Sequence, residues 1–510
     1  MSAREVRQQR KRIAREQSAS LNALARRLRR PLTRRERAAE LRRIQSRNRH
    51  AIEAARRRAE AARQAAIARQ RALEKAMRDE VQALIARDDT TGEDLEVRRA
   101  AVNALGNHIG TAVVMDPITG RIYSIVNQEW ALRRGFKPCS TIKLVTGVAG
   151  LGEKVIDPAN TAAVSDRYNI DLTDALAYSN NTYFQQVGGR VGFEKMMSYA
   201  RDLGLGEKTG INSPNEYSGR LPYEKTGFAL NRMSSHGDDF EVTAVQLATL
   251  VSAMGNGGKL LVPRVARTEE EQAKFKTKIK RQIKVEPEAW RRMVPGMVGA
   301  VNYGSGKKAY DPLQTVAGKT GTCIGQGGWL GLFTSYAPLA NPRLAVVVIS
   351  RGPDARRHFP AAVAGRIYRE LNSRFGTPVN LQLATAPGTD DPKAAELNEE
   401  EKDAAEAAAA EVAATEAAAA AAAAEVTAAE SMAADATKTA LPSDARVRPP
   451  LATEMTAPRS TVKPVLMQIP RRSADAPKSD TSKPGATKVS QQPAKTLSSG
   501  EERPRRVQPN

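Results

Sequence analysis

The chain has 510 residues, a formal net charge of +23 at pH 7 and only 5% aromatic residues. So few aromatic side chains exclude one continuous core from end to end, and the length allows about two to four domains. The charge favours an anionic partner such as a membrane surface, a cell-wall polymer or nucleic acid. It is unevenly placed, because the first hundred residues hold 28 Lys and Arg against 14 Asp and Glu.

Residues 1–88 predict a basic arm that is helical or partly disordered. Ala, Arg, Glu and Gln dominate it, and Pro31 is its one expected helix break. Leu and Ile are too sparse for a sustained heptad repeat, which favours a solvated basic helix over a long coiled coil. We expect the arm to contact an anionic membrane or cell-wall polymer. Nucleic acid is not expected, because no aromatic residues or recognisable binding module accompany the basic residues.

Residues 89–378 predict an α+β domain. Residues 91–94 suit the start of a helix that runs to about residue 105, and residues 111–116 and 121–126 predict a hairpin around the turn at 117–120. Helical and loop segments follow to about residue 257. Three successive strands are then expected at 315–322, 329–336 and 344–350, before a helix at 361–375. Strands at both ends of a domain with helices between them indicate an α+β fold.

Residues 379–510 predict a low-complexity tail. Residues 404–436 are mostly Ala and Glu, which suits a helix without a bulky apolar face, and from Pro442 onward Pro, Ser, Thr, Lys and Arg predict disorder.

Neither a metal nor another cofactor is expected. The chain has two cysteines, Cys139 and Cys323, and four histidines without metal-ligand spacing. No stretch approaches the roughly 18 apolar residues of a membrane-spanning helix, and the N-terminal residues lack the apolar run of a secretory signal.

Three short motifs carry the chemistry, and they occur in a particular order. Ser140 and Lys143 are three residues apart and would share a helix face, so that a neutral lysine can accept the serine proton. Residues 179–181 (Ser-Asn-Asn) follow, and residues 319–322 (Lys-Thr-Gly-Thr) lie in a predicted strand. A single match arises readily by chance, but the ordered set is the signature shared by penicillin-binding proteins and serine β-lactamases.

Residues from about 105 to 375 resemble a penicillin-binding-protein transpeptidase domain. Residues 136–143 resemble the family's Pro-Gly-Ser-Thr-x-Lys, residues 243–258 resemble a helix common to these domains, and residues 328–333 are similar to the strand after Lys-Thr-Gly. The resemblance implies a five-stranded antiparallel sheet flanked by helices, together with a helical lobe. The active site would lie between the sheet and the lobe.

The resemblance also implies a role for each residue of the first two motifs. Ser140 would be acylated, with Lys143 as its base. Ser179 and Asn181 would line the opposite wall, relaying protons and holding the substrate amide.

The third motif would bind the substrate carboxylate through Lys319 and the hydroxyls of Thr320 and Thr322, in the strand that contains Gly321. The backbone N–H groups of Ser140 and Thr322 would form the oxyanion hole, where one donor is typically worth about 3 kcal/mol.

The two cysteines flank this implied oxyanion hole. Cys139 precedes Ser140, and Cys323 follows Thr322. Because both N–H donors must point at one substrate oxygen, the resemblance places the cysteines within the roughly 4.4–6.8 Å Cα separation of a disulfide. A bridge of this placement resembles the one in some carbapenem-hydrolysing class A β-lactamases. We therefore predict a Cys139–Cys323 disulfide that rigidifies the oxyanion hole, with two small buried thiols as the alternative.

The expected function is that of a serine D,D-transpeptidase that acts on D-Ala-D-Ala stem peptides of peptidoglycan and is acylated by β-lactam antibiotics, with D-Ala-D-Ala carboxypeptidase as a variant. A serine β-lactamase is the nearest rival, because the same motifs serve it. It needs a deacylating glutamate, whereas the candidate Glu216 precedes Gly-Arg-Leu-Pro at 219–222, which resembles penicillin-binding proteins. A third possibility is a non-catalytic sensor of β-lactams or muropeptides.

The expected location is outside the cytoplasm, in the periplasm or cell envelope, although no signal peptide or membrane span is visible. A peptidoglycan substrate and a disulfide would both favour it, because disulfides are rare in the cytosol.

Overall fold

A computed structural model describes residues 3–157, 161–164, 169–325 and 328–377, together with the helical residues 405, 406, 409, 410 and 413. Except for these five positions, the tail expected from residue 379 onward lies outside the described residues. Its predicted helix at 404–436 and its predicted disorder from Pro442 therefore stay predictions.

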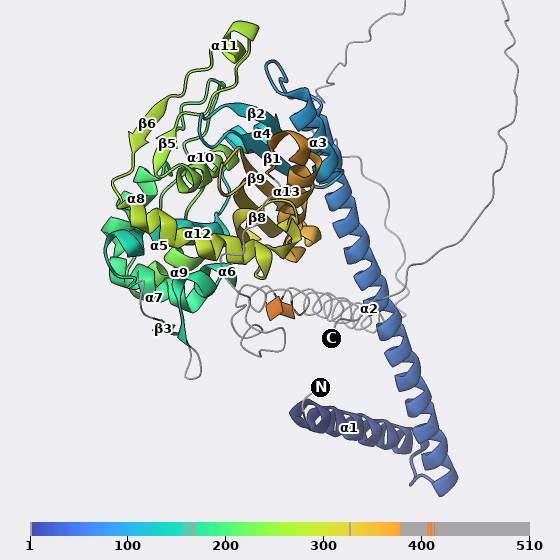
Figure 1. Ribbon diagram of the computed structural model, residues 1–510. Helices are drawn as coiled ribbons and strands as arrows, with labels where there is room; N and C mark the ends of the chain where they lie inside the picture. Colours follow the sequence, from blue (N-terminus) through green and yellow to red (C-terminus); the bar gives the residue numbers. More distant parts are fainter. Residues whose placement is uncertain are drawn as a thin grey trace, which may run out of the picture. The chain divides into compact units, whose positions relative to one another are not determined.

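A five-stranded antiparallel sheet forms the centre of the domain (Figure 1). The strands lie in the order β2-β1-β9-β8-β7, with bounds β1 (Gly110–Met115), β2 (Ile122–Val126), β7 (Ala317–Gly325), β8 (Gly328–Ala337) and β9 (Leu344–Arg351). The hairpin β1-β2 and the meander β7-β8-β9 are far apart in the sequence, and they join where Ala112 of β1 pairs with Val348 of β9. The predicted α+β fold and five-stranded sheet are confirmed.

Helices cover both faces of the sheet, so the central strands are apolar almost throughout. One face packs against α3 (Leu95–Leu105) and α13 (Phe359–Glu370), which lie side by side in Figure 1. The other packs against α10 (Ala244–Gly255), which is buried nearly all round and accordingly has no polar face. The α10 helix begins with a capping box between Thr243 and Gln246.

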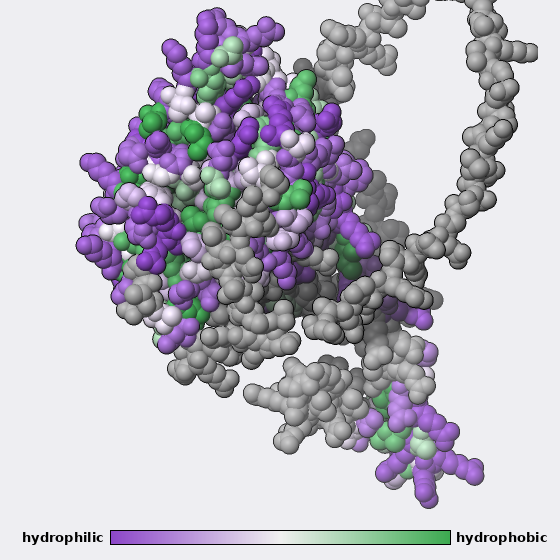
Figure 2. All heavy atoms as spheres, in the orientation of Figure 1, coloured by the Kyte–Doolittle hydropathy of each residue, from purple (hydrophilic) through white to green (hydrophobic). Residues whose placement is uncertain are grey.

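A helical lobe shares the core on the α10 side of the sheet. Its helices are α5 (Lys143–Gly152), α6 (Leu172–Ala177), α7 (Asn181–Val191), α8 (Phe193–Asp202), α9 (Gly227–His236) and α12 (Pro287–Asn302). The shorter helices and turns are α4 (Gln128–Arg133), η1 (Cys139–Ile142), α11 (Glu269–Ala273), η2 (Lys307–Ala309), η3 (Pro353–Arg357) and α14 (Asn372–Phe375). Two small hairpins pair β3 (Ala162–Ala163) with β4 (Asn169–Ile170) and β5 (Lys259–Leu261) with β6 (Ile279–Gln282). The face seen in Figure 2 is mostly hydrophilic, as expected when the apolar residues lie inside.

The basic arm consists of two helices, α1 (Ala3–Leu28) and α2 (Arg34–Ile85), with the expected break at Pro31 between them. Thr33 caps α2 in a capping box with Glu36. Leu32 and Ile44 are buried in this part of the arm, where the Ser20 hydroxyl donates to the Glu40 carboxylate. None of the described helices is both long and apolar enough to cross a membrane.

The last turns of α2 pack as part of the domain. Val81 is buried in the core cluster of the lobe side, and Met77 packs against the same cluster. Just beyond the helix, the Asp88 carboxylate accepts hydrogen bonds from the backbone N–H groups of Asn127 and Gln128, both at 2.8 Å. The boundary expected between residues 88 and 89 therefore cuts contacts that belong to the domain.

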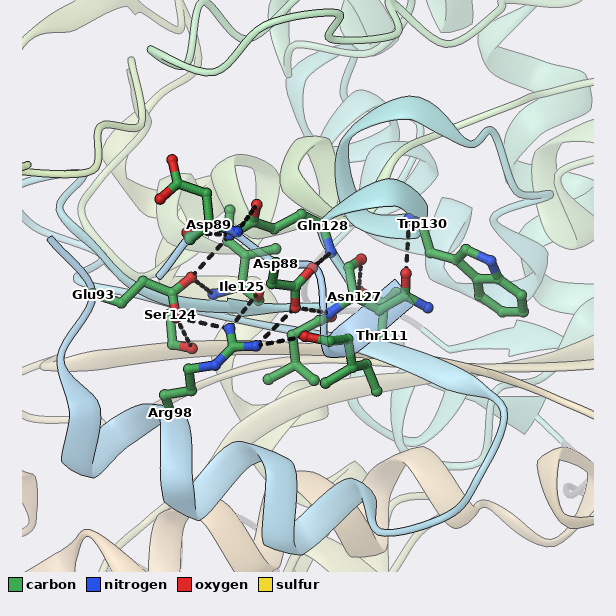
Figure 3. A network of polar contacts seen from close by, with 12 residues as sticks. Asp88, Asp89, Glu93, Arg98, Thr111, Ser124, Ile125, Asn127, Gln128 and Trp130 are labelled. Atoms are coloured by element: carbon green, nitrogen blue, oxygen red, sulfur yellow. Dashed lines mark hydrogen bonds and ion pairs between the residues drawn. The ribbon is translucent and has the colours of Figure 1, made fainter. Parts of the chain in front are cut away.

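An arginine links Asp88 to the sheet (Figure 3). The Arg98 guanidinium pairs with Asp88 and Glu93, both at 2.9 Å, and these two carboxylates are almost fully buried. Glu93 in turn accepts a hydrogen bond from the Ser124 hydroxyl of β2. Because buried charges are stable only when paired, this network fixes the segment between α2 and α3 against the edge of the sheet.

Candidate active site

The turn that contains the candidate nucleophile Ser140, called the nucleophile turn below, is a 3₁₀ helix, in which residues three positions apart share a face as expected from the sequence. Ser140 lies in η1 (Cys139–Ile142), and Lys143 is the first residue of α5. Side chains three residues apart eclipse in a 3₁₀ helix, which brings Lys143 Nζ to 3.0 Å from Ser140 Oγ. Cys139, which starts the turn, has a φ of +48°, a left-handed backbone that non-glycine residues rarely adopt.

Lys143 reaches from the nucleophile to the second motif. Its fully buried Nζ lies within hydrogen-bond distance of Ser179 Oγ at 3.1 Å, the Ser179 carbonyl at 2.7 Å and Asn181 Oδ1 at 2.5 Å. A buried lysine needs such partners, because an unpaired polar group away from water is costly. The first two motifs therefore form one hydrogen-bonded cluster.

The loop between α6 and α7 holds Ser179 in a strained conformation. Ser179 has a φ of +61°, and the Asn180 N–H closes the loop by donating to the Ala175 carbonyl at 2.9 Å. Asn180 also caps α7, because its Oδ1 accepts from the Tyr183 N–H at 2.8 Å. Left-handed non-glycine residues cluster at functional sites, where the surroundings hold them in place.

The third motif lies on strand β7 and forms the sheet side of the site. Lys319 is fully buried, and its Nζ donates to Ser179 Oγ at 2.7 Å, so this hydroxyl lies between the Nζ atoms of two lysines. Gly321 faces the nucleophile turn, where a Cβ atom would lie 3.0 Å from the Pro138 carbonyl oxygen and 3.2 Å from Thr141 Cγ2. The close approach of strand and turn explains the glycine at this position.

The two threonines of the third motif differ in their partners. Thr320 Oγ1 is hydrogen bonded to Ser305 Oγ at 2.7 Å. Thr322 Oγ1 is buried and has no hydrogen-bond partner in the part of the chain that the structure describes. Of the two hydroxyls expected to bind a substrate carboxylate, only that of Thr322 has no hydrogen bond within the described residues and can therefore donate to a ligand.

The predicted disulfide between Cys139 and Cys323 is present, with the Cα atoms 5.7 Å apart. It joins the residue before the nucleophile to the residue after Thr322. The nucleophile turn and β7 are therefore connected covalently as well as through the Lys143–Ser179–Lys319 contacts.

Asp238 supports the segment that leads into the nucleophile turn. Asp238 forms ion pairs with Lys137, three residues before Ser140, and with Arg232 of α9 at 2.8 Å. Burial raises the pKa of Asp238, but the hydrogen bonds and charges of Arg232 and Lys137 outweigh burial and lower this pKa below its ordinary value. Asp238 therefore stays ionised and holds Lys137 beside the turn.

Glu216, the candidate for a deacylating base, is engaged elsewhere. Its buried carboxylate accepts from the backbone N–H groups of Thr209 at 2.6 Å and Gly210 at 3.1 Å. The carboxylate therefore stabilises the loop of residues 209–216. This structural role agrees with the resemblance of residues 219–222 to penicillin-binding proteins.

Sequence reasoning missed Ser305. The residue lies between Gly304 and Gly306, just after α12, and this Gly-Ser-Gly run indicates only a turn. No local sequence pattern predicts that this turn contacts β7, which begins a dozen residues later.

Comparisons with known proteins agree with this geometry. The family model of the penicillin binding protein transpeptidase domain matches residues 110–373, just over half of the chain. The chain is 26% identical to stage V sporulation protein D of Bacillus subtilis over 309 residues, which cover 54% of this chain and 48% of that protein. It is 24% identical to the peptidoglycan D,D-transpeptidase MrdA of Acinetobacter baumannii over 346 residues, 52% of each chain. It thus spans about half the length of these curated relatives.

A solved structure with the same fold is that of Pseudomonas aeruginosa PBP2 in complex with WCK 5153. The two structures superpose with a TM-score of 0.51 at 22% sequence identity, over 56% of this chain and 76% of that one. Together with the family model, this likeness accounts for the sheet and the lobe. The chain belongs to the penicillin-binding-protein transpeptidase family.

Proposed function

We propose that the chain is a serine D,D-transpeptidase that acts on peptidoglycan stem peptides ending in D-Ala-D-Ala and is acylated by β-lactams. The observation that carries this proposal is the convergence of Ser140, Lys143, Ser179 and Lys319, which are connected by contacts of 2.7–3.1 Å. The names of the relatives, among them peptidoglycan D,D-transpeptidases, support the same substrate.

In the acylation step, Ser140 Oγ attacks the carbonyl carbon of the penultimate D-Ala. Neutral Lys143 accepts the hydroxyl proton over the 3.0 Å contact. The carbonyl oxygen becomes an oxyanion, which the backbone N–H groups of Ser140 and Thr322 stabilise. When the peptide bond breaks, the departing D-Ala amine takes a proton that Lys143 returns through Ser179 Oγ, 3.1 Å away.

Substrate binding uses the remaining residues of the site. Lys319 and the free hydroxyl of Thr322 bind the terminal carboxylate, which is a charge-assisted interaction. The Asn181 side chain holds the substrate amide. The acyl-enzyme is then resolved by the amine of a second stem peptide, which gives a cross-link, or by water, which gives simple hydrolysis. A β-lactam follows the same first step, but its leaving nitrogen stays attached to the ring-opened product.

The location and the anionic partner are part of the proposal. The peptidoglycan substrate and the Cys139–Cys323 disulfide both favour an oxidising compartment outside the cytoplasm. The arm presents exposed arginines along much of α2, which suits an anionic membrane or cell-wall polymer.

Fluorescent penicillin tests the proposal. The wild-type chain is expected to take up one label per molecule in a form that survives denaturing electrophoresis, and Ser140→Ala is expected to lose it. Undiminished labelling of Ser140→Ala would show that another residue is the nucleophile.

A further inference from the structure

The turn that follows α12 touches both walls of the active site. On one side it lies against the end of α6, where the Ser305 N–H donates to the Ala177 carbonyl at 3.0 Å. The contact is so close that a Cβ atom on Gly304 would lie 2.1 Å from the same carbonyl oxygen. Ala177 is two residues before Ser179, so the turn supports the second motif through its backbone.

On its other side the turn supports the third motif through a side chain. Ser305 Oγ lies 2.7 Å from Thr320 Oγ1, and both residues are buried, with 4% and 1% of their surface exposed. Successive residues of a strand point to opposite faces. Because Gly321 and Cys323 face the nucleophile turn, Ser305 contacts β7 from the face that Thr320 occupies.

Lys319 donates into the same chain of contacts. Its ammonium group has no acceptor, so it donates to the Thr320 carbonyl at 3.2 Å and, over a long contact of 3.5 Å, to Thr320 Oγ1. The Thr320 hydroxyl also shares the 2.7 Å hydrogen bond with Ser305 Oγ, in which either oxygen can donate. Ser305 thus orients the hydroxyl that lies beside the Lys319 ammonium group.

We propose that Ser305 is a positioning residue that sets the separation of Lys319 from Ser179. Its backbone holds the segment before Ser179, and its hydroxyl holds Thr320, which is adjacent to Lys319 in β7. The inference rests on the proposed transpeptidase function, because the separation matters only if Lys319 and Ser179 act on one substrate. Ser305 itself touches neither Ser140 nor Lys143 in the contacts described above.

Ser305→Ala is expected to slow acylation by fluorescent penicillin roughly 3- to 10-fold, as loss of one buried hydrogen bond would. The limiting rate and the half-saturating concentration are measured separately on the labelled fraction. Partial unfolding would reduce the amplitude of labelling, whereas misplacement of Lys319 and Ser179 reduces the limiting rate. Ser305→Thr, which keeps the hydroxyl, is expected to restore most of that rate. An unchanged limiting rate in Ser305→Ala would overturn the inference.

Ser335→Ala is the matched control. Ser335 is a fully buried serine on the neighbouring strand β8, and its hydroxyl contacts Tyr368 of α13 at 2.9 Å and the Val346 carbonyl at 3.1 Å, neither of which belongs to the three motifs. The variant is expected to lose stability without a change in the limiting rate of acylation. An equal slowing in Ser335→Ala and Ser305→Ala would assign the effect to general loss of packing and overturn the positioning role.

A double-mutant cycle with Thr320→Val tests the route. If Ser305 acts through Thr320, Ser305→Ala combined with Thr320→Val is no slower than Thr320→Val alone. Multiplying effects would overturn this route. If Ser305→Ala does not fold, Ser305→Cys, which is similar in size and both a weaker donor and a weaker acceptor, takes its place in the cycle. Failure of the wild-type chain to label at all would instead refute the proposed function and is thereby distinguished from failure of the inference.

Discussion

The disulfide between Cys139 and Cys323 joins two residues that are 184 positions apart in the sequence and flank Ser140 and Thr322, the two proposed oxyanion donors. One of them belongs to the nucleophile turn and the other to the strand at the edge of the sheet. The separation of the two donors is therefore set by a covalent bond, whereas Lys143, Ser179 and Lys319 hold the opposite side of the site through hydrogen bonds.

Removing this bridge is expected to affect both stability and acylation. Replacing Cys139 and Cys323 by alanine should cost about 2–4 kcal/mol in the free energy of unfolding, typical of a disulfide, and should slow acylation because the oxyanion donors are less well ordered. Denaturant melts and labelling rates measure the two effects. A reducing agent should lower the stability and the acylation rate of the wild type and leave both unchanged in the double variant. Two titratable thiols in the denatured, unreduced wild type would contradict the bridge.

Lys143→Ala is expected to reduce the limiting rate of acylation by about 10²- to 10⁴-fold, because it removes the proposed base. Lys319→Ala should differ in kind, raising the half-saturating penicillin concentration more strongly than it lowers the rate, because Lys319 binds the carboxylate. Rapid-mixing measurements over a range of penicillin concentrations separate the two parameters. A Lys143→Ala variant that acylates at the wild-type limiting rate would exclude lysine as the base.

The acyl-enzyme is expected to last for minutes or longer. Glu216, the candidate deacylating base, instead accepts hydrogen bonds from the backbone of Thr209 and Gly210. Glu216→Gln should lower the melting temperature and leave the rate of deacylation unchanged. Turnover of nitrocefin and the decay of the fluorescent label measure that rate. Rapid nitrocefin turnover by the wild type would favour the β-lactamase alternative.

Residues before position 89 are expected to contribute to the stability of the domain. A fragment of residues 74–377 should bind penicillin and melt at a higher temperature than a fragment of residues 89–378, because the shorter one lacks Val81 and Asp88. Equal melting temperatures would favour the predicted boundary at residue 89.

Within the whole chain, Arg98→Ala is expected to cost about 3–5 kcal/mol, because it leaves two buried carboxylates unpaired. The neighbouring, exposed Arg99→Ala is the control and should change stability by less than about 0.5 kcal/mol. Chemical denaturation measures both variants, and a small effect of Arg98→Ala would show that the network in Figure 3 adds little to stability.

Asp238 is expected to make the stability of the domain depend on pH in the acid range. The folded protein holds this carboxyl at a lowered pKa, so the unfolded chain binds the proton more readily. The contribution is present above the ordinary carboxyl pKa of about 4 and is lost as the pH falls through the lower folded-state value. Asp238→Asn should therefore show a smaller loss of melting temperature between neutral and acid pH than the wild type. Parallel curves for the two proteins would contradict this role.

Local patterns in the sequence sufficed to predict much of the fold and to propose the reactive residues. The apolar runs of β8 and β9 predict buried strands, because a strand covered on both faces must be apolar throughout. Pro31 predicts a helix break because it cannot donate an interior hydrogen bond. Ser140, Lys143 and Lys319 are predicted from the order of the motifs and the family resemblance that they carry, since their chemistry depends on residue type and their spacing lies within short segments.

Tertiary structure alone decided which distant segments meet. The hydroxyl of Ser305 orients Thr320, and Asp88 anchors the end of α2, through contacts that span 15 and about 40 residues. Such contacts leave no periodic pattern in the sequence, because a single hydrogen bond between two distant segments imposes no spacing on the neighbouring residues. The 3₁₀ form of the nucleophile turn also depends on tertiary packing. Strand β7 lies close against the turn at Gly321 and Pro138, and the disulfide joins the two segments. A segment of one turn has too few hydrogen bonds of its own to determine the helix type.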